Sequence, residues 1–249
     1  MQNLLFSLLL TILAGLGLSY NALHAANDAM QPAHISHAPW HAQLQKYVSA
    51  TGSVNYAAWK RDEATLDAYL KSLSAQAPGA DWTRNEQMTF WINAYNAFTV
   101  KLILKNYPLK SITDLKDPWD QKFITIGGRS LSLNDIEHEI LRKQFADPRI
   151  HFAVNCASKS CPVLLNQAFS ADKLDSQLDA QARAFINDSK LNRLAANKAE
   201  LSEIFNWYRS DFEQNGSTLI AFINRYASTK LQAAAAISHL PYDWSLNGR

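Results

Sequence analysis

The segment of residues 83–104 constrains the fold more than any other part of the sequence. Thr83 and Glu86 have the spacing of a capping box, in which each side chain accepts a hydrogen bond from the backbone of the other residue. Apolar residues continue to about Leu104, and Tyr107-Pro108 ends the run. They cover nearly the whole circumference of a helix, at Phe90, Trp91, Ile92, Tyr95, Phe98, Val100, Leu102 and Ile103. The sequence therefore predicts a long helix that is central and buried.

The rest of the sequence predicts further helices and a few short strands. Helical periodicity appears near residues 40–48, 66–73, 136–141, 174–185, 204–212 and 219–226. Residues 122–131 indicate a hairpin with a turn at Gly127-Gly128, and residues 191–201 indicate a second one turning at Asn197. Residues 149–155 are the best single strand, and residues 240–244 form an irregular tail. We expect an α+β fold, a mostly helical single domain with a small β-sheet built from short strands.

The N-terminal residues are typical of a secretory leader. Residues 1–25 contain no Lys, Arg, Asp or Glu, and the apolar run of about 15 residues from Leu4 is shorter than the ~20 residues that span a bilayer. We predict a signal peptide over residues 1–25 that is cleaved after Ala25, a flexible linker over 26–39 and one globular domain over 40–249. The mature protein is then periplasmic or secreted, with no stable membrane span. An uncleaved anchor is the alternative, because the leader lacks a basic residue near its start.

Charge and histidine spacing narrow the choice of partners. The 24 basic and 22 acidic residues are well mixed, which gives a nucleic-acid partner little support, and we expect a small molecule or a peptide instead. His34, His37 and His41 have roughly the spacing of metal ligands on one helical face, but Pro39 interrupts that face. The sequence therefore favours a linker there, and no metal or cofactor is predicted.

Both cysteines lie in the segment of residues 149–162. Cys156 and Cys161 are separated by four residues in a chain that is expected to reach an oxidising compartment, so a disulfide between them is the favoured interpretation. A ring this small stabilises the fold by only about 2 kcal/mol, so the bridge would shape its loop. A free catalytic thiol, a redox-active pair and a pair of metal ligands are the alternatives.

The same segment holds the candidate catalytic residues His151, Cys156 and Cys161. If residues 149–155 are extended, His151, Ala153 and Asn155 point to one side and form a polar floor. His151 and Cys156 are then roughly 16 Å apart along the strand. A thiol and its base must lie within about 3 Å of each other. Cys161 reaches His151 only if its loop folds back.

Two buried amides point to the same region. Asn93 and Asn96 lie three residues apart in the buried helix, and a buried amide without a partner costs about 1–3 kcal/mol. We therefore expect both to find partners in the 149–162 segment. They either fix the helix through internal hydrogen bonds or line a pocket where Asn96, His151 and Asn155 converge.

Charged residues nearby complete the candidate binding residues. Glu137 and His138 are adjacent on a helix, so their side chains diverge by about 100°. We expect one of them to pack and the other to be exposed, with His138 as the other possible base. Arg149 is expected to anchor a carboxylate such as Glu137 or Asp135.

Four motifs resemble the family called domain of unknown function 547. They are Phe90-Trp-Ile-Asn-Ala-Tyr-Asn96, Leu133-Asn-Asp-Ile-Glu-His138, Arg149-Ile-His-Phe-Ala-Val-Asn-Cys156 through Ser160-Cys-Pro162, and Leu240-Pro-Tyr-Asp-Trp244. The resemblance runs from about Trp40 to Leu246. It implies no activity and transfers no catalytic residue, although the family's exported bacterial members agree with the predicted leader.

Two functions compete. The favoured one is a binding module, in which the polar floor recognises a ligand and the bridged cysteines stiffen the loop. The alternative is a thiol- or histidine-dependent hydrolase or acyl transferase that acts on a small periplasmic substrate. In it, Cys156 or Cys161 is the nucleophile and His151 the base, and Asn96 or Asn155 orients a carbonyl. The sequence leaves open whether the protein is an enzyme.

Overall fold

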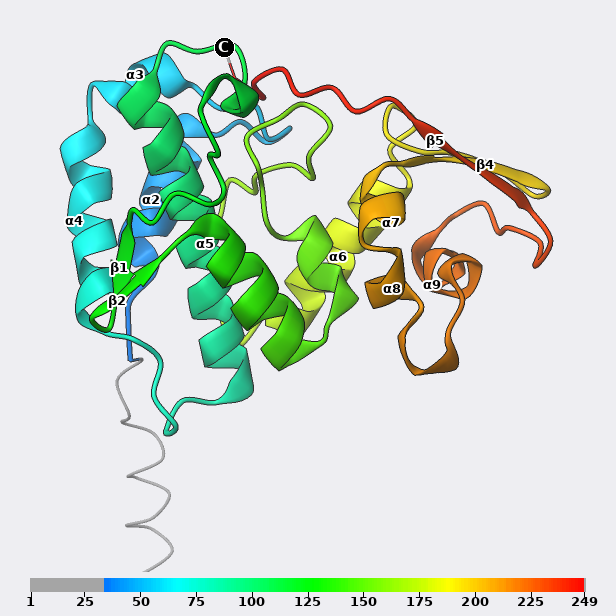
Figure 1. Ribbon diagram of the computed structural model, residues 1–249, viewed down its shortest axis with the longest axis horizontal. Coiled ribbons are helices and arrows are strands. Elements are labelled where there is room, and N and C mark those ends of the chain that lie inside the picture. The colour runs from blue at the N-terminus through cyan, green and yellow to red at the C-terminus, as the bar shows by residue number, and fades with distance from the viewer. Residues whose placement is uncertain (1–33, 249) are drawn as a thin grey trace, which may run out of the picture. The chain divides into compact units, whose positions relative to one another are not determined.

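The computed structural model of the protein describes residues 34–248 (Figure 1). The predicted signal peptide and most of the predicted linker lie outside this range. From Ile35 onward the described chain is one compact unit. Helix α2 (Ala38–Tyr47) begins two residues before Trp40 and has Pro39 in its first turn, where a missing N–H costs no helical hydrogen bond. Within residues 34–248, none of the helices combines the length and apolarity that a membrane crossing requires.

The first half of the described chain packs around helix α5 (Arg84–Asn106). The predicted capping box between Thr83 and Glu86 is present, and every residue from Met88 to Leu104 is buried except Lys101. The elements that pack against α5 are α3 (Tyr56–Lys60), α4 (Glu63–Ala75) and the π-helical segment η2 (Asp135–Phe145). Helix α2 packs in turn against α3 and α4. The prediction of a long, buried, central helix is confirmed.

A second cluster of buried side chains gathers the C-terminal helices. These helices are α6 (Leu174–Ile186), α7 (Ile204–Trp207), α8 (Arg209–Phe212) and α9 (Leu219–Tyr226), and Figure 1 shows α7, α8 and α9 close to one another. Phe152, Phe205, Phe212 and Phe222 form its centre, with ring centroids between 4.9 and 6.2 Å apart. The helix predicted over residues 204–212 is broken at Tyr208, which lies between α7 and α8.

Two small sheets accompany the helices. Strands β1 (Ile124–Ile126) and β2 (Arg129–Leu131) form the first predicted hairpin, and Gly127 and Gly128 take the positive φ that its turn requires. Strands β3 (Arg193–Ala195) and β4 (Lys198–Ser202) form the second predicted hairpin. Strand β5 (Ala236–Leu240) was not predicted and pairs parallel with β4. The mostly helical α+β fold is confirmed. The described chain also contains the single 3₁₀ turns η1 (Ile112–Asp114) and η4 (Gln214–Gly216).

After β5, the chain runs back as an irregular tail toward the elements that pack around α5 (Figure 1). Ser245, Leu246 and Gly248 form isolated bridges with Ser111, Ser158 and Val54, respectively. The tail therefore joins three segments that are far apart in the sequence.

The strand predicted over residues 149–155 is wrong. Residues Pro148–Phe152 form the 3₁₀ helix η3, because Asp147 caps it by accepting from the Arg149 N–H at 3.0 Å and Pro148 supplies a helical φ. His151 and Asn155 therefore do not share a strand face, and the expected polar floor does not form.

Candidate functional site

The strongest candidate site is a cavity of about 230 Å³ that we call the aromatic pocket. Its aromatic lining consists of Tyr95, Trp119, Trp207, Tyr208, Tyr242 and Trp244. Its other lining residues are Asn134, Glu137, Val154, Cys156, Cys161 and Ile204. They come from α5, the turn that holds Trp119, η2, α7, the C-terminal tail and the segment around residues 156–161, which we call the cysteine loop. The pocket is therefore built by tertiary packing.

Three aromatic rings pack together at one wall of the aromatic pocket. The rings of Trp207 and Trp244 are stacked, with centroids 5.7 Å apart, and Tyr242 lies 4.8 and 4.5 Å from them. Trp119 meets Trp244 edge-on at 5.6 Å. Trp207 is 45% exposed, which is unusual for so large an apolar side chain in this protein. Its exposure places it at the solvent side of the wall.

Glu137 is the charged residue of the aromatic pocket. It is 6% exposed, and the Tyr208 hydroxyl donates to its Oε1 at 2.8 Å. In the described chain, no Lys, Arg or His forms an ion pair with it. Burial, and next the charge of Glu137, raise the pKa of Tyr95 and of Tyr208 above the usual range. Both phenols therefore stay protonated beside the carboxyl group. Glu137 packs as expected, whereas the adjacent His138 is half-buried rather than exposed.

Tyr208 is held in place by a network of side chains centred on Asp211. The His151 ring stacks on Tyr208 with centroids 3.9 Å apart, and the Arg142 guanidinium lies 5.1 Å from the Tyr208 ring centre. Asp211 accepts from Arg142 Nε at 2.6 Å and Nη2 at 2.8 Å, and its Oδ2 lies 2.7 Å from His151 Nε2. Asp211 thus orients both groups that hold the tyrosine ring.

His151 is buried behind the aromatic pocket and does not line it. Burial lowers the pKa of His151, so its ring is neutral near pH 7. With Nε2–H donating to Asp211, Nδ1 carries the lone pair, and this atom has no hydrogen-bond partner among the described residues. A histidine oriented by a carboxylate has the geometry of a general base. Among residues 34–248, however, neither sulfur of the cysteine loop forms a hydrogen bond with His151.

The predicted disulfide between Cys156 and Cys161 is present, with the Cα atoms 6.1 Å apart. Polar contacts hold the same loop: Asn155 Nδ2 donates to the Pro162 carbonyl at 2.7 Å, and Ser158 Oγ lies 3.1 Å from the Tyr242 hydroxyl. Both cysteines line the aromatic pocket. In this form neither sulfur is a thiolate, so the nucleophile of the catalytic hypothesis is absent.

The buried amides act as structural braces. Asn96 donates to the Ala153 carbonyl at 2.9 Å and accepts from the Asn155 N–H at 2.8 Å, so its expected partners in the 149–162 segment are confirmed. Asn93 instead bonds the backbone of Phe169, outside that segment, so the expectation for Asn93 is wrong. His151 makes no hydrogen bond with Asn96 or Asn155, because its ring turns toward Asp211.

Residues 80–186 match the model of a known family, and its description is Protein of unknown function, DUF547. The family resemblance is confirmed there. The DUF547 segment contains Tyr95, Glu137, Cys156 and Cys161, whereas Trp207, Tyr208, Tyr242 and Trp244 lie beyond it. A search of the curated proteins and a search of the solved structures each gave no match.

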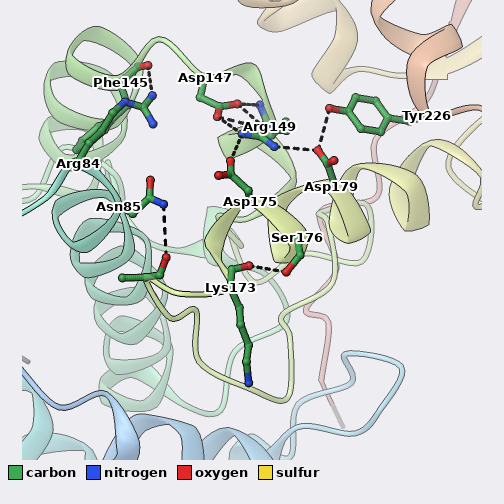
Figure 2. A network of polar contacts seen from close by, with 11 residues as sticks. Arg84, Asn85, Phe145, Asp147, Arg149, Lys173, Asp175, Ser176, Asp179 and Tyr226 are labelled. Atoms are coloured by element: carbon green, nitrogen blue, oxygen red, sulfur yellow. Dashed lines mark hydrogen bonds and ion pairs between the residues drawn. The ribbon is translucent and has the colours of Figure 1, made fainter. Parts of the chain in front are cut away.

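Arg149, also in the DUF547 segment, does not bind Glu137 or Asp135. It bonds Asp147 at 2.6 Å, Asp175 at 2.8 Å and Asp179 at 2.8 Å (Figure 2). The expected partners are wrong because the 3₁₀ turn directs Arg149 toward α6. Hydrogen bonding to Asp147, above all, raises the pKa of the guanidinium further. Arg149 therefore anchors η3 to α6. Among residues 34–248, no cluster of three His, Cys, Asp or Glu side chains is suited to a metal ion.

Most of the aromatic lining was missed by sequence reasoning. The sequence predicted that Trp207 and Tyr208 belong to an ordinary amphipathic helix and that residues 240–244 form an irregular tail. The available signal was the aromatic sequence Tyr242-Asp-Trp244 itself, because a short aromatic motif without periodicity has no obvious packing role.

Proposed function

We propose that the protein is an exported binding module that holds a small organic molecule in the aromatic pocket. The main evidence is the composition of this pocket, in which aromatic side chains surround one buried carboxyl group. Apolar, aromatic walls with a few placed polar groups are typical of small-molecule sites. A volume of about 230 Å³ suits a ligand of only a few heavy atoms and is too small for a folded peptide.

The disulfide and the polar loop contacts support binding without turnover. They stiffen one wall of the aromatic pocket, and a preorganised wall loses less entropy when a ligand binds. Asp211 preorganises Tyr208 in a similar way, because it orients the Arg142 and His151 side chains that contact the tyrosine ring.

Ligand-observed NMR with a mixture of neutral, cationic and anionic small molecules tests the proposal. Some members should bind the full mature protein and lose most of their binding in Trp207→Ala. Trp207 is exposed enough for the variant to stay folded. Val163→Ala, at the other large exposed apolar residue of the described chain, is the control and should bind normally. The proposal fails if no member binds, or if both variants bind like the parent protein.

Export is supported by the apolar leader and is compatible with the disulfide. N-terminal sequencing of the protein made in a bacterium with a periplasm should begin at Ala26. A cytoplasmic protein that still starts at Met1 would contradict export.

The alternative remains a thiol- or histidine-dependent hydrolase or acyl transferase. The presence of both sulfurs in the pocket lining favours it over other enzymes, but it requires the bridge to be reduced. We expect no free thiol when the mature protein is denatured without reductant. Two free thiols in the native, purified protein would move the enzyme hypothesis to first place.

A further inference from the structure

We infer that the ligand of the aromatic pocket is an organic cation of the methylated-ammonium class, with Glu137 as its counter-ion. The inference rests on the proposed function and specifies the chemistry of its ligand.

The first support is the unpaired charge of Glu137. A buried carboxylate is costly unless an opposite charge and hydrogen bonds compensate it. Tyr208 supplies one hydrogen bond. Arg142 forms its direct ion pair with Asp211 and acts on Glu137 only through longer-range electrostatics, and His151 also bonds Asp211. The pocket lining contains no Lys or Arg, so no resident cation occupies the place beside the carboxyl group. A bound cation would provide the missing counter-charge.

The second support is the nature of the walls. Faces of Trp and Tyr attract a cation by about 0.5–1 kcal/mol each at exposed sites and by about 2 kcal/mol when water is excluded. The stacked pair of Trp207 and Trp244, with Tyr242 beside it, offers several such faces in one cavity. A methylated ammonium group spreads its charge over methyl groups, so it loses little hydration when it enters an apolar cage.

The same residues disfavour a metal ion. Hard cations such as Ca²⁺ require several oxygen ligands, and zinc requires nitrogen or sulfur ligands. The pocket lining provides one carboxylate, no histidine, and sulfur atoms that are bridged to each other. An organic cation needs only one counter-ion and aromatic contact.

Calorimetric titration with choline and with 3,3-dimethyl-1-butanol separates charge from shape. The second probe carries a carbon atom where choline carries its charged nitrogen, so the two molecules fill the same space. Choline should bind the full mature protein at least tenfold more tightly than the neutral probe.

Glu137→Gln provides the matching change in the protein. Gln retains an oxygen that accepts from Tyr208, so the variant should stay folded, which its circular dichroism and melting temperature check. It should weaken choline binding at least tenfold and leave the neutral probe unchanged. Glu139→Gln, an exposed position on the same η2 segment, should behave like the parent protein.

The outcomes distinguish the two proposals. Equal binding of both probes overturns the cationic ligand but leaves a small-molecule pocket. If neither probe binds, the methylated-ammonium class is rejected, and the mixture of neutral, cationic and anionic compounds then decides the proposed function. Choline binding that survives Glu137→Gln also overturns the inference, because the carboxylate would not be the counter-ion.

Discussion

Asp211 and Glu137 are two carboxyl groups in one network with opposite surroundings. Burial alone would raise the pKa of Asp211, but hydrogen bonds from Arg142 and His151 hold it well below the usual range. Glu137 accepts from the Tyr208 hydroxyl and has no ion pair among residues 34–248. Asp211 stabilises the network, whereas Glu137 is the proposed counter-ion of the ligand.

Asp211→Asn tests the stabilising role. The variant leaves the Arg142 guanidinium without its counter-charge, and hydrogen bonds to charged groups contribute about 1.5–3 kcal/mol. We expect urea unfolding at pH 7 to show a loss of about 2 kcal/mol. Asp175 also pairs with an arginine, but its side chain is 73% exposed, so Asp175→Asn should change stability very little. Equal losses in the two variants would show that burial of the pair is unimportant.

A second residue-scale prediction concerns acid. Burial lowers the pKa of His37 to about 4, and its Nδ1 lies 2.7 Å from the Tyr69 hydroxyl. The unfolded chain has a histidine pKa of about 6.5, so below that pH it binds more protons than the folded protein. The stabilising contribution of neutral His37 is therefore complete above about pH 6.5 and is lost as the pH falls toward 4.

His37→Asn should flatten this part of the stability profile. Melting temperatures at pH 8, 6.5 and 5 measure it, with pH 8 as the baseline for each protein. A slope remains in the variant, because the pKa of His151 is also lowered by burial and acts in the same direction. An unchanged slope would mean that His37 is not protected from water.

At the scale of elements, local signals predicted well. Helix α5 has its capping box and both hairpins have their turn residues, so short-range chemistry determines where each of them starts or turns. The strand prediction for residues 149–155, part of which forms η3, was wrong because the alternation of apolar and polar residues was given more weight than Asp147-Pro148. That pair is itself a signal for the start of a helix. Strand β5 was missed because it is only partly buried, and its parallel pairing with β4 depends on a distant segment.

The candidate site was predictable only where one segment carried it. Asn96, Glu137 and the cysteines stood out as polar or sulfur side chains in an apolar context. The aromatic wall was not predictable, because Trp207 and Trp244 meet only through tertiary packing.

A prediction at the scale of elements concerns the disulfide of the cysteine loop. Replacing Cys156 and Cys161 together by Ser should cost about 2 kcal/mol in urea unfolding, because the unfolded chain gains the freedom of a small loop. Asn155 and Ser158 still hold the loop through their hydrogen bonds, so the affinity for choline should change less than threefold. A loss of binding without a loss of stability would instead point to a direct chemical role of the sulfur atoms.

At the scale of the whole described molecule, the C-terminal tail joins the two buried clusters. Gly248 lies so close to the Tyr56 ring that an added Cβ atom would overlap it, and the Tyr56 hydroxyl donates to Asn247 Oδ1 at 2.8 Å. Only glycine therefore allows the tail to dock here.

Gly248→Val should displace the tail from Tyr56. Overpacking of this kind costs about 1–3 kcal/mol. Because Tyr242 and Trp244 belong to the same tail, choline binding should weaken as well. Thermal melting and the choline titration measure the two effects. Normal binding in a destabilised variant would show that the pocket wall is independent of the tail's docking.

The position of the tail at the end of the chain also determines when the pocket can form during synthesis. The pocket wall needs Tyr242 and Trp244, so it is complete only after the last ten residues of the chain have been made. A chain that ends before residue 242 would therefore lack two of the aromatic side chains that line the pocket.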